Sequence, residues 1–261
     1  MDHPREPLPS LVDATPPVPS GFVAALDDAL GALGIPLSPL ERTTIEGHVR
    51  LLLAWNRAIN LTAIREPSRV ATAHVADSLT AVPWLRARAV PSLLDLGSGG
   101  GFPGLPLAVL LPDTAVTLVD AVGKKARFLE TVAAATGLAP RVRATAARAE
   151  ALAHSPDHRE AWSVVTARAV TSLADLVELA VPLLIPGGSL IAWKRGDLDA
   201  ELAAAERALG TLGGGRLEVA TVGAGVADLD GHALVIATRR PDGRVPAAYP
   251  RDPAARARRP W

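Results

Sequence analysis

A glycine-rich stretch near the middle of the chain constrains its fold more than any other feature. Residues 93–104 read Leu-Leu-Asp-Leu-Gly-Ser-Gly-Gly-Gly-Phe-Pro-Gly, an apolar run followed by a glycine loop. Glycine adopts positive φ without strain and lets a ligand approach the main chain closely. Pro103 suits the first turn of a helix, whose free N–H groups and positive dipole end favour an anionic ligand. The stretch therefore predicts a buried strand, a nucleotide-binding loop and a helix.

Two cofactor classes fit this loop. Residues 99–104 match the dinucleotide pattern G-x-G-x-x-G, in which an acid about 20 residues later holds a ribose hydroxyl. Asp120, at the end of the next apolar run, suits that role. The overlapping pattern D-x-G-x-G-x-G at 95–101 resembles the first motif of S-adenosylmethionine-dependent methyltransferases, which also place an acid after the second strand. A loop whose glycines serve only tight packing is the plainer alternative, but the order of strand, loop, helix and second acid favours cofactor binding.

The composition excludes several kinds of chemistry. The 261-residue chain contains no cysteine, which excludes disulfides, thiolate zinc sites and thiol nucleophiles. Its formal net charge is zero, so any nucleic-acid surface must be local. Prolines interrupt the apolar runs before they reach the ~18 residues of a membrane helix. The first nineteen residues hold six prolines and no apolar signal core, so we expect a cytoplasmic protein with a disordered leader and no membrane contact.

The periodicity of apolar residues predicts the order of helices and strands. Helical spacing predicts three helices, at 22–33, at 39–58 with Ser38 as the cap, and at 67–79. From Pro91 onward, helical patterns alternate with short apolar runs at 92–97, 115–120, 141–145, 162–167, 188–193, 216–222 and 232–238. This alternation predicts a parallel sheet with helices on both faces. The last two runs have no helix between them, so they should pair antiparallel.

We therefore expect an α/β fold, a Rossmann-like seven-stranded sheet that is mostly parallel with its last strand antiparallel. The expected parts are a disordered leader at 1–20, an N-terminal helical cap at 21–85, the Rossmann-like domain at 86–240 and a basic Pro/Arg-rich tail at 241–261. Seven arginines follow residue 238, at 239, 240, 244, 251, 256, 258 and 259. The tail is either solvated or an arm that binds phosphates, and the sequence leaves both open.

Several separated motifs together resemble the RsmG (GidB) family of rRNA small subunit methyltransferases. They are WNRAINLTAI at 55–64, H-x-x-D-S at 74–78, LDLGSGGGFPG at 94–104 and D-x-x-G-K-K-x-R-F-L at 120–129. The resemblance extends over about residues 25–240. It implies a class I methyltransferase that transfers a methyl group from S-adenosylmethionine to N7 of one guanine in the 16S rRNA of the small ribosomal subunit. We expect it to act as a monomer.

The resemblance also implies six cofactor-binding residues. They are Gly97 and Phe102 in the first loop, Asp120 after the second strand, Ala149 and Glu150 after the third, and Arg168 after the fourth. In the family, the acid after the second strand binds the ribose hydroxyls and the pair after the third contacts adenine. An exposed acid at a helix start is the plainer interpretation of Glu150, but its position after the third strand favours adenine binding.

The implied chemistry needs no catalytic acid or base. Guanine N7 has a free lone pair and no proton to remove, so positioning of the reactants can supply most of the acceleration. Methylation at pyrimidine C5 normally needs a thiolate, which this chain lacks. Methylases of exocyclic amines resemble one another in an Asn/Asp-Pro-Pro-aromatic loop after the fourth strand, where this chain reads Arg-Ala-Val-Thr at 168–171. We therefore expect no catalytic side chain, and we see no metal site.

Other polar and aromatic residues admit two interpretations each. The cations after the second and fifth strands are either solvated or in contact with phosphates: Lys124, Lys125, Arg127, Lys194 and Arg195. His74 and Asp77 share a helical face and form either a structural clasp or part of the substrate side. Three tryptophans either stack bases or pack in the core: Trp55, Trp84 and Trp193.

Three other functions remain open at this point. The same fold can act on a small-molecule or protein substrate, the chain can be a nicotinamide-dependent oxidoreductase, or it can be a noncatalytic S-adenosylmethionine-binding assembly factor.

Overall fold

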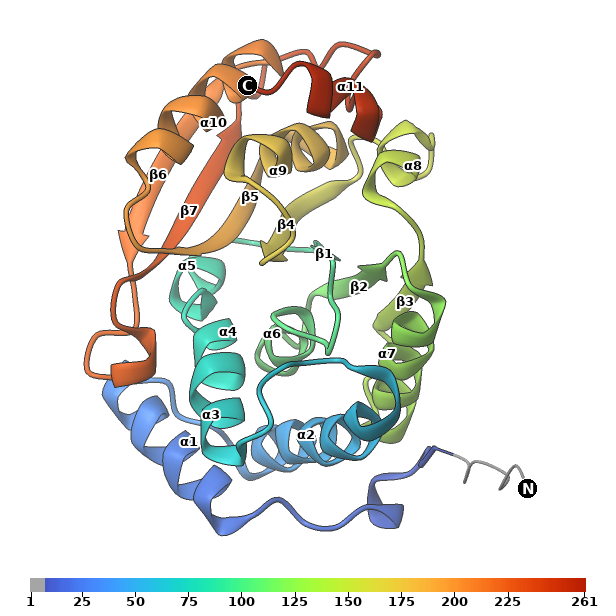
Figure 1. Ribbon diagram of the computed structural model, residues 1–261, viewed down its shortest axis with the longest axis vertical. Coiled ribbons are helices and arrows are strands. Elements are labelled where there is room, and N and C mark those ends of the chain that lie inside the picture. The colour runs from blue at the N-terminus through green and yellow to red at the C-terminus, as the bar shows by residue number, and fades with distance from the viewer. Residues whose placement is uncertain (1–7) are drawn as a thin grey trace.

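A seven-stranded sheet with the order β3-β2-β1-β4-β5-β7-β6 forms the centre of the computed structural model, which describes residues 8–261 (Figure 1). The strands are β1 Ser92–Leu96, β2 Ala115–Asp120, β3 Val142–Ala146, β4 Trp162–Arg168, β5 Leu184–Arg195, β6 Gly215–Thr221 and β7 His232–Arg239. Along the sheet, the five neighbouring strands β3, β2, β1, β4 and β5 pair in parallel. Strand β7 is antiparallel to both β5 and β6. The predicted fold class is confirmed, including the antiparallel pairing of the last two strands.

The N-terminal helices cover one face of the sheet (Figure 1). They are α1 Ser20–Leu33, α2 Pro39–Ile59, α3 Pro67–Val70, α4 Asp77–Leu79 and α5 Val82–Arg86, and they share this face with α6 Gly104–Leu110 and α7 Gly123–Ala135. The start of α2 is set locally, because Ser38 accepts a hydrogen bond from the Glu41 N–H and Glu41 accepts one from the Ser38 N–H. The apolar side of α2 then packs against α6 and α7.

The opposite face of the sheet is covered by helices from the second half of the chain (Figure 1). They are α8 Ala149–His154, α9 Leu173–Ala180 and α10 Asp199–Thr211, followed at the end of the chain by α11 Pro253–Arg258. Short 3₁₀ turns lie at Val12–Ala14, Val181–Leu183 and Ala227–Leu229. None of the helices within residues 8–261 is long and apolar enough to span a bilayer.

The predicted helix at 67–79 forms, but its middle is wound differently. Residues Ala71–Ala76 make a π-helical turn between α3 and α4. Such turns widen a helix locally and are frequent at functional sites. The turn contains His74 and leads directly into Asp77, which is 2 % exposed.

The expectation of a disordered leader does not hold for residues 8–19, and residues 1–7 lie outside the described part. Leu8, Val12 and Val18 pack against the core. The indole Nε1 of Trp55 donates to the Pro9 carbonyl at 2.8 Å, and Arg50 donates to the carbonyls of the same segment. The prolines suggest a solvated chain, but the apolar residues between them find partners on α2.

The register of the parallel strands aligns the residues expected to form the site. Leu96 lies beside Val119 of β2 and beside Ala167 of β4. The residues that follow them in the chain, Gly97, Asp120 and Arg168, therefore lie at the same carboxyl edge of the sheet. In open α/β sheets this edge is where ligands bind.

Candidate cofactor and substrate site

Two cavities meet at Gly97, on the carboxyl edge of the sheet. The first, about 430 Å³, lies against the ends of β1, β2 and β3 and includes Ala149 and Glu150 in its lining. The second, about 520 Å³, lies toward the N-terminal helices and includes Phe102, Arg168 and Trp193. Both volumes are in the range of small-molecule sites. Gly97 lines both cavities, so a ligand that extends past this glycine can occupy the two together.

The backbone at Gly97 needs glycine. Its φ is +73°, and a Cβ there would lie 2.7 Å from Cγ2 of Val170, which also lines the first cavity. Gly99 has φ +53°, and its Cβ would meet only the Gly97 carbonyl, at 3.8 Å. The loop thus exposes its main chain to the cavities, as a close-fitting cofactor requires.

Asp95, in β1, connects the strand to the start of the helix that follows the glycine loop. Its carboxylate accepts hydrogen bonds from the Thr166 hydroxyl at 2.8 Å and from the Gly104 N–H at 3.2 Å. Burial raises the pKa of Asp95 to about 6, although the hydrogen bonds from Ser98, Thr166 and Gly104 oppose the rise. Helix α6 begins at Gly104, one residue later than expected. Its first N–H is occupied by Asp95 rather than directed at a ligand.

Asp120 lies at the site but lines neither cavity. Its side chain accepts hydrogen bonds from the Gly99 N–H at 3.1 Å and from the Val122 N–H at 2.9 Å. Lys125 lies 3.8 Å from the same carboxylate. The neighbours Val119 and Ala121 line the first cavity. Asp120 thus holds the glycine loop in place through its hydrogen bond from Gly99. Its role in ribose binding stays a prediction.

Ala149 and Glu150 begin α8 and line the first cavity together with Ala147 and Arg148. Glu150 is paired with Arg256 from the last helix, with Oε1 and Nη2 2.5 Å apart. Burial raises the pKa of Glu150, but the hydrogen bond from Arg256 and other effects outweigh this and the net pKa is lowered. The adenine-binding role expected for these two residues stays a prediction.

Phe102 lies between two imidazole rings. The ring of His48 is 4.7 Å from the Phe102 ring, and that of His74 stacks on it at 4.7 Å and 18°. His48, in α2, hydrogen-bonds the Gly100 carbonyl through Nε2 at 2.7 Å, so this helix is attached directly to the glycine loop. Burial lowers the pKa of His48 to about 4 and, with a contribution from the Arg168 charge, that of His74 to about 3. Both rings are therefore neutral at pH 7.

Arg168 is the centre of a polar network at the second cavity. Its Nη1 donates to Asp77 Oδ2 at 2.9 Å and to the Ala73 carbonyl at 3.0 Å, and its Nη2 lies 2.8 Å from His74 Nδ1. His232 Nδ1 lies 3.0 Å from the other oxygen of Asp77. His74 and Asp77 are thus linked through Arg168, not to each other. The next residue, Ala169, has φ +56°, a conformation rare for alanine and common at functional sites.

The cations predicted to contact phosphates differ in their surroundings. Lys125 pairs with Asp120, and Lys194 pairs with Glu201 at 2.6 Å. Lys124 and Arg127 are exposed and line neither cavity. Arg195 is exposed and lines the second cavity. Phosphate binding by these five residues stays a prediction, for which Arg195 is the best placed.

The tryptophans are mainly structural. Trp55 is 4 % exposed and bonds the Pro9 carbonyl. Trp84 lies under the guanidinium of Arg88, 3.7 Å from its carbon. Trp193 is 5 % exposed and donates to the Asp77 carbonyl at 2.8 Å, but it also lines the second cavity.

Several site residues were missed by reasoning from the sequence. His48 and His232 reach the site from α2 and β7, and Arg69 and Asp228 line the second cavity. Arg256 reaches it from the last helix. No local motif marks these positions, because each one depends on how distant elements pack. Within residues 8–261, no three His, Asp or Glu side chains are arranged to hold a metal ion.

The family model of rRNA small subunit methyltransferase G matches residues 41–229. A ribosomal RNA small subunit methyltransferase G from Roseiflexus castenholzii is 42% identical over 226 residues, which cover 85% of this chain and 93% of that protein. The protein of the same name from Chloroflexus aggregans is 43% identical over 231 residues, 88% of this chain and 94% of that protein. The one from Bacillus subtilis is 36% identical, covering 86% of this chain and 92% of that protein.

Solved structures show the fold. A putative O-methyltransferase from Klebsiella pneumoniae has a TM-score of 0.53 at 16% identity, covering 83% of this chain and 96% of that one. The O-methyltransferase from Bacillus cereus in complex with SAH has a TM-score of 0.52 at 15% identity, covering 83% and 97%. The fold is thus that of class I methyltransferases. With a family model that matches more than half of the chain and relatives similar over most of their length, this chain belongs to the rRNA small subunit methyltransferase G family.

Proposed function

We propose that the protein transfers a methyl group from S-adenosylmethionine to N7 of one guanine in the 16S rRNA of the small ribosomal subunit. The observation that carries the proposal is the meeting of two cavities at Gly97, one beside the adenine-matching pair Ala149–Glu150 and one beside Arg168. The names of the relatives, ribosomal RNA small subunit methyltransferase G, supply the substrate class. The target base comes from the family resemblance.

The residues of the first cavity fit the proposed cofactor. Gly97 leaves the main chain open to this cavity, Asp120 lies one residue from the lining, and Glu150 offers a carboxylate. When bound, S-adenosylmethionine supplies a methyl group on a sulfonium leaving group. The chain holds this methyl donor against the glycine loop and positions the guanine, the methyl acceptor, in the second cavity. Orienting the two reactants accelerates a direct displacement.

The charged groups that line the second cavity match the hydrogen-bonding groups of a guanine. Guanine carries acceptors at O6 and N7 and a donor at its N2 amino group. The lining provides the cations Arg69 and Arg195 and the carboxylate of Asp228. Since N7 has no proton to remove, the site needs no general base. Neutral His74 and the Arg168–Asp77 pair line this cavity and are held in place by hydrogen bonds to one another through Arg168.

The test is in two parts. Calorimetry should show micromolar binding of S-adenosylhomocysteine and no binding of NADH, and the reverse result would favour the oxidoreductase alternative. Labelled S-adenosylmethionine should then transfer its methyl group to 16S rRNA, or to small subunits, prepared from a strain that lacks the gene. Label on a protein or small molecule but not on rRNA would contradict the proposed substrate. Cofactor binding without any transfer would favour the assembly-factor alternative.

A further inference from the structure

The last residues of the chain form one side of the first cavity. Pro253, Arg256, Ala257 and Pro260 line it opposite the strand ends and the start of α8. The match to the family model ends at residue 229, so this segment lies outside it. We call residues 249–261 the C-terminal segment.

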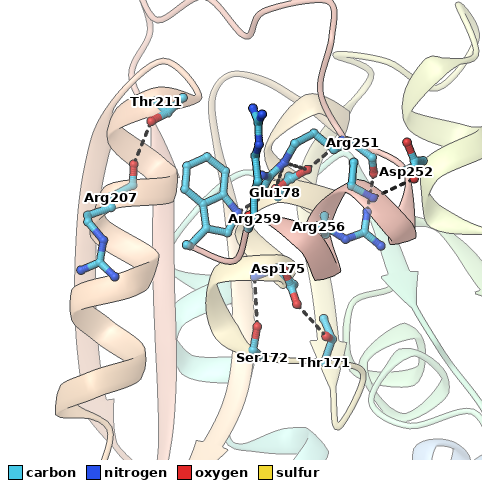
Figure 2. A network of polar contacts seen from close by, with 12 residues as sticks. Thr171, Ser172, Asp175, Glu178, Arg207, Thr211, Arg251, Asp252, Arg256 and Arg259 are labelled. Atoms are coloured by element: carbon cyan, nitrogen blue, oxygen red, sulfur yellow. Dashed lines mark hydrogen bonds and ion pairs between the residues drawn. The ribbon is translucent and has the colours of Figure 1, made fainter.

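A buried ion pair anchors the C-terminal segment to α9. Glu178 is fully buried, and Arg251 grips its carboxylate with Nε at 3.0 and 3.1 Å and Nη2 at 2.5 Å (Figure 2). The indole of Trp261 donates to the same carboxylate at 2.7 Å. A buried carboxylate is stable only with such partners. The expected solvated tail or phosphate arm is therefore a folded element at this point, and Arg251 is unavailable to phosphates.

Contacts with α8 and the loop after it hold the start of the segment. Arg159 Nη1 donates to the Tyr249 carbonyl at 2.8 Å and to the Ala153 carbonyl at 2.9 Å. His154 Nε2 lies 2.9 Å from the Pro250 carbonyl oxygen. Both ends of α11 are thus attached to the elements that carry the cofactor cavity.

Arg256 connects the segment to the cavity itself. Its side chain is 11% exposed and that of Glu150 is 19% exposed. Its Nη1 donates to the Arg251 carbonyl at 2.7 Å, so one half of the guanidinium is fixed by the segment and the other half holds Glu150. Both side chains line the first cavity.

The chemistry of this wall suits an adenine ring. Adenine presents a donor at its N6 amino group and acceptors at its ring nitrogens, between two apolar faces. The Glu150 carboxylate accepts, the Arg256 guanidinium donates, and Ala149, Pro253 and Ala257 supply apolar surface. Apolar walls with a few placed polar groups are the usual lining of a small-molecule site.

Resting on the proposed function, we infer that the C-terminal segment completes the adenine end of the S-adenosylmethionine site, with Arg256 holding the Glu150 carboxylate in place for the base. The segment is then part of the cofactor-binding machinery and determines its affinity.

Calorimetry of the full-length protein with S-adenosylhomocysteine tests this inference. We expect Arg256→Ala to weaken binding about tenfold or more. Arg258→Ala is the matched control, because it removes the same charge from the same helix at an exposed position that lines neither cavity. It should bind as the wild type does. Deletion of 253–261 should weaken binding at least as much as Arg256→Ala. It keeps both residues of the Arg251–Glu178 pair and removes the Trp261 hydrogen bond to Glu178.

A pH series separates positioning from a general loss of structure. Without Arg256, the hydrogen bond that lowers the pKa of Glu150 is lost while the opposing effect of burial remains, so the affinity of Arg256→Ala should begin to fall at a higher pH than that of the wild type as the pH is lowered. Urea unfolding checks that each variant is folded. If Arg256→Ala does not fold, Arg256→Gln takes its place, because glutamine keeps a hydrogen-bond donor at this position. The affinity of Arg256→Gln for S-adenosylhomocysteine should lie between those of the wild type and Arg256→Ala.

The outcomes distinguish this inference from the proposed function. If the wild type does not bind S-adenosylhomocysteine, the proposed function fails and the inference fails with it. If the wild type binds but folded Arg256→Ala and the truncated chain bind equally well, only the inference fails. Tighter binding by these variants would also overturn it, because the segment would then compete with the cofactor.

Discussion

Arg168 and Asp77, 91 residues apart in the chain, form an ion pair at the second cavity, with Nη1 and Oδ2 2.9 Å apart. The side chain of Asp77 is 3% exposed and that of Arg168 is 15% exposed. The pair joins the end of β4 to the helix at 67–79, and so connects the catalytic sheet to the N-terminal cap.

Removing Arg168 should therefore destabilise the fold. Arg168→Ala leaves the buried Asp77 carboxylate hydrogen-bonded to His232 but without its cationic partner, and loss of one partner of a buried pair typically costs about 3–5 kcal/mol. Urea unfolding at pH 7 measures the change. Arg240→Ala, which breaks an exposed pair with Asp242, should leave the unfolding midpoint unchanged. Equal effects of the two substitutions would contradict a structural role for the Arg168–Asp77 pair.

Gly97→Ala should weaken cofactor binding about tenfold or more, about 1.4 kcal/mol. The added Cβ would lie 2.7 Å from Val170 in the wall of the first cavity. Gly187→Ala is the matched control, since its φ of +81° is equally unfavourable for alanine but its Cβ would have no heavy atom within 4 Å. Calorimetry with S-adenosylhomocysteine compares the two. Normal binding by Gly97→Ala would show that the ligand does not approach this glycine.

His48 should make the protein less stable in acid. Its pKa is lowered from 6.5 to about 4 by burial, so the unfolded state takes up a proton between these values and the folded state does not. The stabilising effect of neutral His48 is complete above about pH 6.5 and is lost as the pH falls toward 4. From pH 7 to pH 5 this amounts to about 2 kcal/mol.

Urea unfolding at pH 7 and pH 5 checks this prediction, with His48→Gln as the comparison because glutamine can still donate to the Gly100 carbonyl and does not titrate. The variant should lose less stability between the two pH values than the wild type does. The same loss in both proteins would assign the acid sensitivity to other groups.

Arg195 should contact an RNA phosphate. It is exposed at the second cavity, where a base would enter. Arg195→Ala should lower the slope of log K against log salt for 16S rRNA binding by about 1. Arg143→Ala, on the exposed side of β3, should leave the slope unchanged. Filter binding over a range of salt concentrations gives both slopes, and an unaltered slope for Arg195→Ala would exclude the contact.

The sequence predicted those parts of the structure that local chemistry determines. The glycine loop at 95–101, the Ser38 cap and the alternation of strands and helices are each visible within short windows of sequence. The pairing of Arg168 with Asp77 and of Arg256 with Glu150 joins residues 91 and 106 positions apart. Such pairs depend on tertiary packing, which has no local signal.

Composition was misleading at both ends of the chain. Prolines near residue 16 suggested a disordered, solvated leader, and the arginines after residue 238 suggested either a solvated tail or an arm that binds phosphates. Val12 and Val18 nevertheless pack on the core, and Arg251 is drawn back by the buried Glu178. A few well-placed contacts outweigh the average character of a segment, and only the fold shows where these contacts lie.

The most direct test of the proposed function is to map the methyl group. 16S rRNA or small subunits from a strain that lacks the gene are incubated with the protein and labelled S-adenosylmethionine, and the digested RNA is analysed by mass spectrometry. The account predicts label in 7-methylguanosine at a single position of 16S rRNA. Label in another nucleoside, or none in rRNA while S-adenosylhomocysteine still binds, would contradict it.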